Sequence, residues 1–128
     1  MIPSPSLSSM SPSILVDSSN RVIAVLGASG GTKIITAVAQ VLVRMIYMGQ
    51  SVKQAVDARR IHHQLIPMEI LYEDGVTQWM VDGLEKIGHK TRKFSLGGSI
   101  VQAILLDRET GAITANADFR KDGSVDGF

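Results

Sequence analysis

The part of this sequence that most constrains the fold is residues 22–49, which read VIAVLGASGGTKIITAVAQVLVRMIYMG. An apolar run, a glycine-rich turn and a long apolar stretch before Gly49 predict a strand, a turn and a helix from Thr32 to Met48. Because most of this helix surface is apolar, we expect a sheet and another helix to cover most of it. Its polar residues recur every three or four positions in one narrow stripe: Lys33, Thr36, Gln40, Arg44 and Tyr47.

Two hairpins are predicted on either side of the central region. The first joins residues 13–17 to residues 21–26 through the turn SSN, and the second joins residues 99–107 to residues 112–119 through RETG. Both require antiparallel pairing. The fold class predicted from the pattern is therefore α/β (α+β) with antiparallel strands, in a single domain over residues 1–128.

Between the hairpins the sequence predicts two further helices and an extended segment. Ser51 is expected to cap a short helix over 52–60, and residues 64–73 are expected to be extended, with Pro67 at an edge or bend. A helix over 76–88 is expected to bury one apolar face: Val76, Met80, Leu84 and Ile87. Residues 120–128 are expected to form a polar tail.

Composition excludes several classes of partner. Lys and Arg number 13 against 12 Asp and Glu, so the net charge is +1 with no block of like charge, and we expect neither nucleic acid nor an anionic membrane as a partner. The absence of cysteine excludes disulfides and thiolate metal sites. The most apolar stretch is shorter than the ~20 residues that a membrane span needs. The Ser/Pro-rich start lacks a signal-peptide pattern, and we expect the chain to be a piece of something larger.

The glycine turn can be tested against known phosphate motifs. Gly27, Gly30 and Gly31 have the spacing G-x-x-G-G, which fits neither the dinucleotide fingerprint nor the P-loop. Two interpretations remain from spacing alone. Free N–H groups at a helix start can hold an anion, including a transient oxyanion. Alternatively, the glycines only permit a tight strand-to-helix crossing.

Other residues favour structural roles. His62 and His63 are adjacent, so their side chains point to opposite sides of an extended segment and cannot share a metal. We expect no metal and no cofactor. A local ion pair is expected within residues 57–60, from Asp57 with Arg59 or Arg60, and Tyr72 and Trp79 are expected to be packing residues.

Four stretches together resemble one known family. PSLSSMSPSILVD, GASGGTKIITAVAQVL, VDARRIHHQLIP and the terminal DFRKDG are similar, in order and at comparable spacing, to the C-terminal part of the small subunit of gamma-glutamyltranspeptidase. The most specific pieces are LSSM and GGT taken together. The resemblance implies an N-terminal nucleophile hydrolase fold, an αββα sandwich of which this chain would be one incomplete part. It also implies a gamma-glutamyltransferase or glutathione hydrolase activity at an extracellular, cell-surface or periplasmic location.

The resemblance assigns roles at matching positions only. The paired serines that bind the carboxylate of the gamma-glutamyl group correspond to Ser8 and Ser9, and the glycines of the oxyanion hole correspond to Gly30 and Gly31. The implied partners are the large subunit, the missing N-terminal part of the small subunit, and glutathione or another gamma-glutamyl substrate. A serine-rich terminus without a role is the alternative for Ser8 and Ser9.

One departure from the family pattern decides what the chain is expected to do alone. The family's nucleophile is a threonine exposed by cleavage upstream of LSSM, and every threonine here follows that motif. We therefore expect a fragment that supplies about half of a site and is inactive by itself. The alternatives are a non-catalytic light-chain-like protein that acts as a binding or assembly partner, and a nucleotide-binding module, which the glycine spacing disfavours.

Overall fold

The computed structural model describes residues 10–95 and 98–127. Its main sheet is four-stranded, in the order β1-β2-β6-β7, and every neighbouring pair is antiparallel. The strands are β1 (Ser13–Val16), β2 (Val22–Ser29), β6 (Ile100–Leu106) and β7 (Ile113–Ala117). Both predicted hairpins are confirmed, β1 with β2 and β6 with β7. Strand β2 also pairs with β6, so the two hairpins form one continuous sheet.

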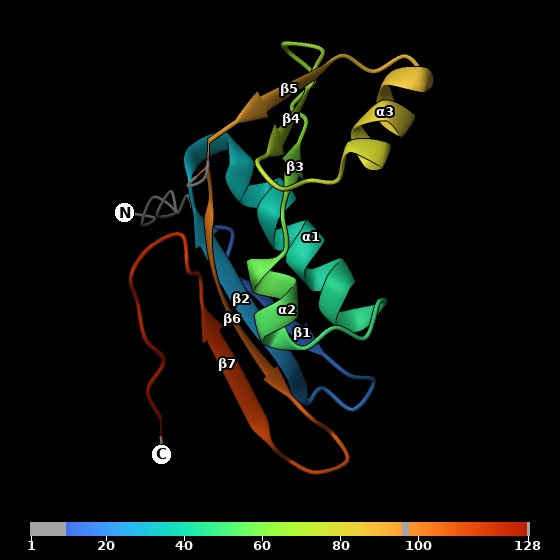
Figure 1. The fold of residues 1–128 in the computed structure, drawn as a ribbon. Helices are drawn as coiled ribbons and strands as arrows, with labels where there is room; N and C mark the ends of the chain where they lie inside the picture. Colours follow the sequence, from blue (N-terminus) through green and yellow to red (C-terminus); the bar gives the residue numbers. More distant parts are fainter. Residues whose placement is uncertain (1–9, 96–97, 128) are drawn as a thin grey trace, which may run out of the picture.

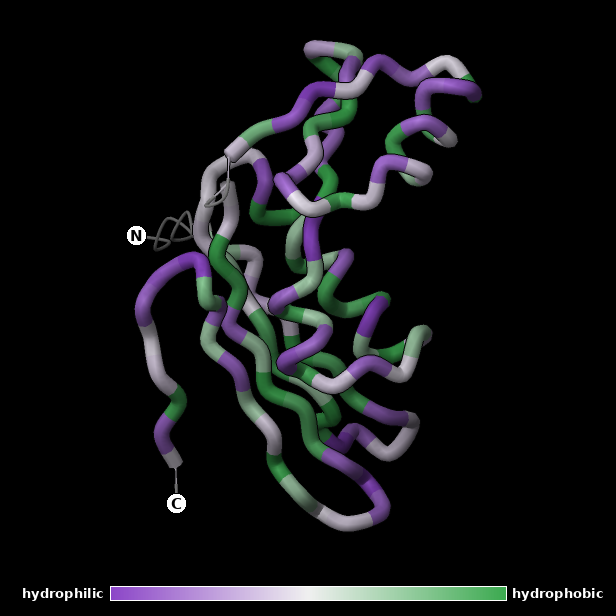
Figure 2. The backbone as a smooth tube through the Cα atoms, viewed as in Figure 1, coloured by the Kyte–Doolittle hydropathy of each residue, from purple (hydrophilic) through white to green (hydrophobic). Residues whose placement is uncertain are grey.

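Two helices cover one face of this sheet (Figure 1). Helix α1 (Ile34–Ile46) lies over β2 and β6, and α2 (Val52–Asp57) lies over β6 and β7. The core between them takes alternate residues of β2 and β6. Figure 2 shows hydrophobic runs along both strands. The fully buried members come from both layers: Ala24, Leu26, Ala28, Val41, Val56, Val101 and Ala103.

Helix α2 begins as the sequence predicts. The Ser51 hydroxyl accepts from the Gln54 N–H at 3.2 Å, and the Gln54 side chain accepts from the Ser51 N–H at 3.0 Å, which completes a capping box. The helix ends earlier than expected, at Asp57. Residues 58–60 leave the helix and enter β3 (Ile61–His62).

A second, three-stranded sheet lies beyond the end of the first (Figure 1). In it β3 pairs antiparallel with β4 (Ile70–Glu73), and β4 pairs parallel with β5 (Thr91–Phe94). The parallel pair and β5 were not predicted, because TRKF carries no apolar alternation. Only the last part of the expected extended segment over 64–73 is a strand.

Helix α3 (Gln78–Lys86) joins β4 to β5 but buries little. Val81 is its buried residue, whereas Ile87 lies beyond its end and is 73% exposed, so the predicted apolar face is wrong at that position. Trp79 is also 73% exposed, which contradicts a packing role for it in this chain.

The polar stripe of α1 faces the second sheet. The Gln40 amide donates to the Ile61 carbonyl at 2.7 Å and accepts from the Ile61 N–H at 3.0 Å, so it completes the backbone hydrogen bonds of β3. The part of the helix that is exposed to solvent is an apolar edge, which includes Ile35 and Val43. The expectation that most of the helix surface is covered therefore fails on that edge.

The face of the main sheet opposite α1 and α2 carries no helix among the described residues. Exposed apolar residues lie along these strands, and Val25 lies directly opposite Ile104 across the β2–β6 ladder. The exposed apolar residues of these strands are Ile14, Val16, Val22, Val25, Ile104 and Ile113. We call this surface the bare sheet face. One covered and one bare face are what half of an αββα sandwich would have.

The bare sheet face predicts self-association of a protein that consists of these 128 residues. Contiguous exposed apolar surface drives association in water. Replacing Val25 and Ile104 together by threonine, which retains strand propensity, should weaken the association and lower the binding of a hydrophobic dye. Sedimentation velocity over a concentration series measures the first effect. The control places threonine at two exposed polar positions, Lys90 and Glu109, and should leave both readouts unchanged. A parent protein that is monodisperse, monomeric and without dye binding would contradict the prediction.

Candidate functional site

The two glycines of the predicted turn have different structural reasons to be glycine. Gly30 follows the last residue of β2 and has φ +133°, and Gly31 opens a short 3-10 turn (Gly31–Lys33) with φ +62°. A side chain on Gly30 would collide with the chain at the start of β6, because its Cβ would lie 2.5 Å from the Gly98 carbonyl oxygen. A Cβ on Gly31 would meet nothing within 4 Å, so only its left-handed backbone favours glycine.

The turn presents backbone donors at an exposed helix start. The Lys33 N–H donates to the Gly30 carbonyl at 3.4 Å, and the Ile34 N–H donates to the Gly31 carbonyl. By contrast, the N–H groups of Gly31 and Thr32 donate to no backbone acceptor in the described part of the chain. Gly30, Gly31 and Thr32 are all exposed. Such free donors at the start of a helix can bind an anion.

A cleft on the bare sheet face begins beside this turn. Its volume is about 470 Å³, and residues 25–29 of β2 and the outward residues of β6 line it, together with Met10, Pro12, Lys121 and Asp122. The Ala28 N–H donates to the Met10 carbonyl at 2.9 Å, which ties the chain at residue 10 to the end of β2. Ser8 and Ser9, the predicted carboxylate-binding pair, lie outside the described residues.

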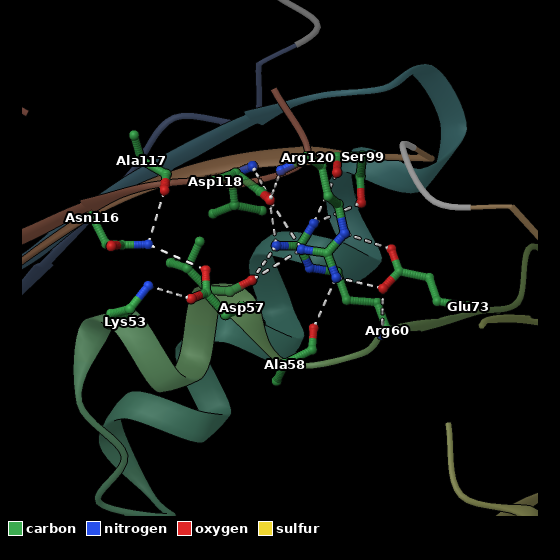
Figure 3. A network of polar contacts seen from close by, with 12 residues as sticks. Lys53, Asp57, Ala58, Arg60, Glu73, Ser99, Asn116, Ala117, Asp118 and Arg120 are labelled. Carbon is green, nitrogen blue, oxygen red and sulfur yellow. Dashed lines mark hydrogen bonds and ion pairs between the residues drawn. The ribbon is translucent and has the colours of Figure 1, made fainter. Parts of the chain in front are cut away.

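A buried network of four charged side chains joins the chain after α2, the end of β4 and the chain after β7 (Figure 3). Arg60 pairs with Asp118 at 2.7 Å, Asp118 pairs with Arg120 at 2.9 Å, and Arg120 pairs with Glu73. All four side chains are at most 4% exposed. We call this set the buried charge network. Its two cations balance its two anions, so the interior carries no net charge from it.

The buried charge network also binds main chain at the end of α2 and in β6. Arg60 donates to the Val56 carbonyl at 2.7 Å and Arg120 donates to the Ala58 carbonyl at 3.0 Å, so both guanidiniums bind the end of α2. The Arg60 N–H donates to Glu73 at the end of β4 at 3.1 Å. The Val101 N–H of β6 donates to Asp118 at 2.8 Å.

The surroundings of Asp118 and Arg120 favour their charged forms. Burial acts to raise the pKa of Asp118, but hydrogen bonds from the Val101 N–H and from Arg60 outweigh it and hold the pKa below the ordinary 3.8. Burial lowers the pKa of Arg60, against the effect of Asp118. Burial also acts to lower the pKa of Arg120, but the hydrogen bonds that it donates to Glu73 and Asp118 leave the pKa raised. The arginines stay cationic at any physiological pH.

Two sequence expectations are corrected by this network. The local ion pair within residues 57–60 does not form as expected, because Asp57 pairs with Lys53 at 2.7 Å and Arg60 reaches Asp118 instead. The expected polar tail is wrong at Arg120, whose side chain is fully buried. The sequence signal was present in VDARR and DFRKDG, where charged residues interrupt apolar ones, but a local pattern does not show pairing across 58 positions.

The histidines lie as the sequence predicts, on opposite sides of their segment. His62 is buried, and its Nδ1 lies 2.8 Å from the Thr36 hydroxyl while its Nε2 lies 3.0 Å from the Gln64 side-chain oxygen. The His63 Nδ1 accepts from the Leu65 N–H at 3.2 Å. Within residues 10–95 and 98–127 the structure has no group of three or more side chains that could hold a metal ion.

No helix in the described part of the chain is both long enough and apolar enough to cross a bilayer.

Comparison with known sequences gives one family. The family profile described as Gamma-glutamyltranspeptidase matches residues 5–128. The chain is 43% identical over 121 residues to Scoloptoxin SSD20 of Scolopendra dehaani, covering 94% of this chain and 61% of that protein. It is 35% identical over 122 residues to the glutathione hydrolase proenzyme of Bacillus subtilis, covering 95% of this chain and 20% of that protein. The chain thus spans only part of the length of these relatives.

Solved structures agree with the sequence comparison. The gamma-glutamyltranspeptidase of Helicobacter pylori superposes with a TM-score of 0.80 at 34% identity, over 90% of this chain and 62% of that one. That of Pseudomonas nitroreducens, complexed with L-DON, gives a TM-score of 0.82 at 31% identity, over 100% of this chain and 66% of that one. These likenesses confirm the predicted fold class of mixed α/β structure with antiparallel strands.

The buried charge network predicts a pH-dependent loss of stability in Asp118→Asn. The substitution leaves Arg60 and Arg120 short of a buried anion, which should lower the free energy of unfolding by about 3–5 kcal/mol at neutral pH. Because the folded-state pKa of Asp118 is depressed, the stability that its charge provides is complete above the ordinary value and is lost as the pH falls below it. Urea unfolding from neutral pH down to about pH 3 should show the difference from the parent shrinking.

The matched control for this test is Asp74→Asn. Asp74 pairs with Lys93 on the surface, where both side chains are more than half exposed, so the change should cost less than about 1 kcal/mol. An Asp118→Asn protein as stable as the parent at neutral pH would show that the network does not support the fold.

Proposed function

The chain belongs to the gamma-glutamyltranspeptidase family, and from that premise we propose that it supplies part of the site of a gamma-glutamyl transferase or hydrolase acting on glutathione and related compounds. Its own contribution is the oxyanion-binding turn at Gly30 and Gly31 and the donor-carboxylate serines Ser8 and Ser9. The observation that carries the proposal is the exposed left-handed turn, whose Gly31 and Thr32 N–H groups have no backbone acceptor among the described residues.

The chemistry of acyl transfer explains why such a turn is useful. A hydroxyl nucleophile attacks the carbonyl carbon of the gamma-glutamyl amide, and the carbonyl oxygen takes up negative charge as the new C–O bond forms. Preorganised N–H donors stabilise that oxyanion by about 3–4 kcal/mol. The amine then leaves with a proton, and water or an amine acceptor attacks the resulting ester. The N–H groups around Gly30 and Gly31 are the donors that we assign to the oxyanion.

The position of residue 10 supports the role of the serines. Ser9 is bonded directly to Met10, whose carbonyl accepts from the Ala28 N–H two residues before Gly30. Met10, the last residue of LSSM, is thereby held at the end of β2 that leads into GGT, beside the cleft on the bare sheet face. Two adjacent hydroxyls can each donate to a carboxylate oxygen without adding a charge.

The bare sheet face indicates what completes the site. Its exposed apolar residues require cover, and in an αββα sandwich a second sheet packs about 10 Å away on such a face. We assign this cover to the N-terminal part of the small subunit, with the large subunit as the further partner. The nucleophile would come from the same part, so that the site forms at the interface between this chain and its partner segment.

The first functional prediction concerns Gly31→Val in a hybrid proenzyme. The hybrid carries residues 5–128 in place of the matching segment of the Bacillus subtilis glutathione hydrolase proenzyme. Valine disfavours the left-handed backbone that directs the Gly31 N–H, so the variant should lower kcat roughly 100-fold or more on a chromogenic gamma-glutamyl anilide, as the loss of one aligned oxyanion donor does. A double Ser8→Ala, Ser9→Ala variant should instead raise KM as well as lower kcat, since it weakens binding of the donor carboxylate.

Gly49→Val is a matched control for the backbone. Gly49 has φ +64° against +62° for Gly31, and a Cβ at either position meets nothing within 4 Å. Both substitutions therefore impose the same left-handed strain, but only Gly31 lies in the turn. If Gly31→Val is folded, self-cleaved and as active as the parent, the glycines only turn the chain. If the unaltered hybrid folds but shows no turnover at all, a non-catalytic light-chain-like role is favoured instead.

The second functional prediction concerns a protein of these 128 residues alone. It should neither hydrolyse nor transfer a gamma-glutamyl group, because no threonine precedes the LSSM motif to serve as nucleophile. Aniline release during incubation of the pure protein with the chromogenic anilide measures this activity directly. Aniline release above a no-protein background would contradict the assignment of the nucleophile to another segment.

A further inference from the structure

The Gly30–Gly31 turn packs directly on the backbone at the start of β6. A Cβ on Gly30 would lie 2.7 Å from the Ser99 Cα as well as 2.5 Å from the Gly98 carbonyl oxygen. A Cβ on Gly98 would in turn lie 2.8 Å from the Lys33 side chain, next to the Phe94 ring. The absence of a side chain on Gly30 lets the two backbones approach closely, so the position of residues 98–99 limits where the turn can lie.

Ser99 is held by Arg60. One guanidinium nitrogen of Arg60 donates to the Ser99 carbonyl at 2.9 Å and to the Ser99 hydroxyl at 3.1 Å. The other nitrogen donates to Asp118, whose same oxygen accepts from the Val101 N–H at 2.8 Å (Figure 3). Ser99 is 3% exposed, so water does not compete for these bonds. Arg60 and Asp118 thereby fix the chain at both Ser99 and Val101.

The Asp118 carboxylate replaces a strand at this point. The last paired residues of β6 and β7 are Gln102 and Ala117, and beyond them β7 offers no partner for β6. Without Asp118 the Val101 N–H would lose its acceptor. On its other edge β6 still pairs with β2, where Ile100 lies opposite Ser29, the residue directly before Gly30. The segment that supports the turn is therefore fixed by side chains on one edge and by β2 on the other.

We propose that Arg60 is a positioning residue for the oxyanion turn: by fixing Ser99 against Gly30, the buried Arg60–Asp118 pair sets the direction of the N–H groups of the turn. The proposal rests on the proposed function of that turn. The planar fork of a guanidinium suits the task, because it fixes Ser99 and Asp118 at once in one geometry. A lysine at this position keeps the charge but cannot reproduce the fork.

The test uses Arg60→Lys and Ser99→Ala in the hybrid proenzyme, with the chromogenic gamma-glutamyl anilide as substrate. Arg60→Lys should lower kcat roughly tenfold to 100-fold with KM nearly unchanged, because small misplacements of catalytic groups cost that much. Ser99→Ala keeps the ion pair and the carbonyl bond, removes only the hydroxyl bond, and should lower kcat several-fold in the same way. The control is Arg92→Lys at an exposed pair with Glu69, which should leave kcat and KM unaltered.

A double-mutant cycle separates positioning from general stability. If Arg60 acts through the turn, Arg60→Lys should lower kcat much less in the Gly31→Val background than in the parent. If the fold-losses in kcat of the two single variants multiply fully in the double variant, the proposal is overturned. If the Arg60→Lys enzyme does not mature, the same cycle is run with Ser99→Ala in its place. A Ser99→Ala enzyme with the kcat of the parent would also overturn the proposal. These outcomes differ from failure of the proposed function, in which Gly31→Val itself leaves kcat unchanged.

Discussion

The fold depends on one costly arrangement, the burial of Arg60, Glu73, Asp118 and Arg120 in a neutral cluster. Each of these charges loses its hydration, and only a complete set of partners compensates for that loss. The partners include carbonyl groups at the end of α2 and the Val101 N–H of β6, so the cluster joins segments that share no sheet ladder. Removal of one member would leave the others buried without compensation. The network therefore specifies a single relative placement of α2, β4, β6 and the chain after β7.

The two faces of the main sheet differ in what covers them. The face under α1 and α2 is closed by a core of small and branched apolar residues, whereas the bare sheet face still exposes Ile14, Ile104 and Ile113. The Gly30–Gly31 turn lies at the end of β2, and the cleft runs from beside it along β2 and β6 on the bare sheet face. A site built there stays open until another segment covers the sheet. If the proposed function is right, this geometry lets the turn be rigid before a second segment covers the sheet.

Local signals made part of this structure predictable from the sequence. The two hairpins follow from apolar runs around short turns, and the Ser51 cap follows from a serine three residues before Gln54. The Gly30–Gly31 turn was likewise visible, although its two glycines serve different needs. Pairing of Arg60 with Asp118 was not predictable, because 58 residues separate them and only the closed sheet brings them together. The role of Gln40 in completing β3 was hidden for the same reason.

The Gly30–Gly31 turn is rigid for a physical reason. Glycine is flexible, yet donors for an oxyanion must be preorganised to be effective, so a pair of glycines is a poor choice unless the surroundings hold it. On the helix side the Lys33 N–H binds the Gly30 carbonyl. On the strand side β2 pairs with β6 up to Ser29, and Ser99 blocks Gly30 from moving. A side chain at Gly30 would push these backbones apart. Glycine at position 30 thus allows the turn to pack closely on the backbone at Ser99. Because Arg60 fixes Ser99, this contact in turn restricts the motion of the turn.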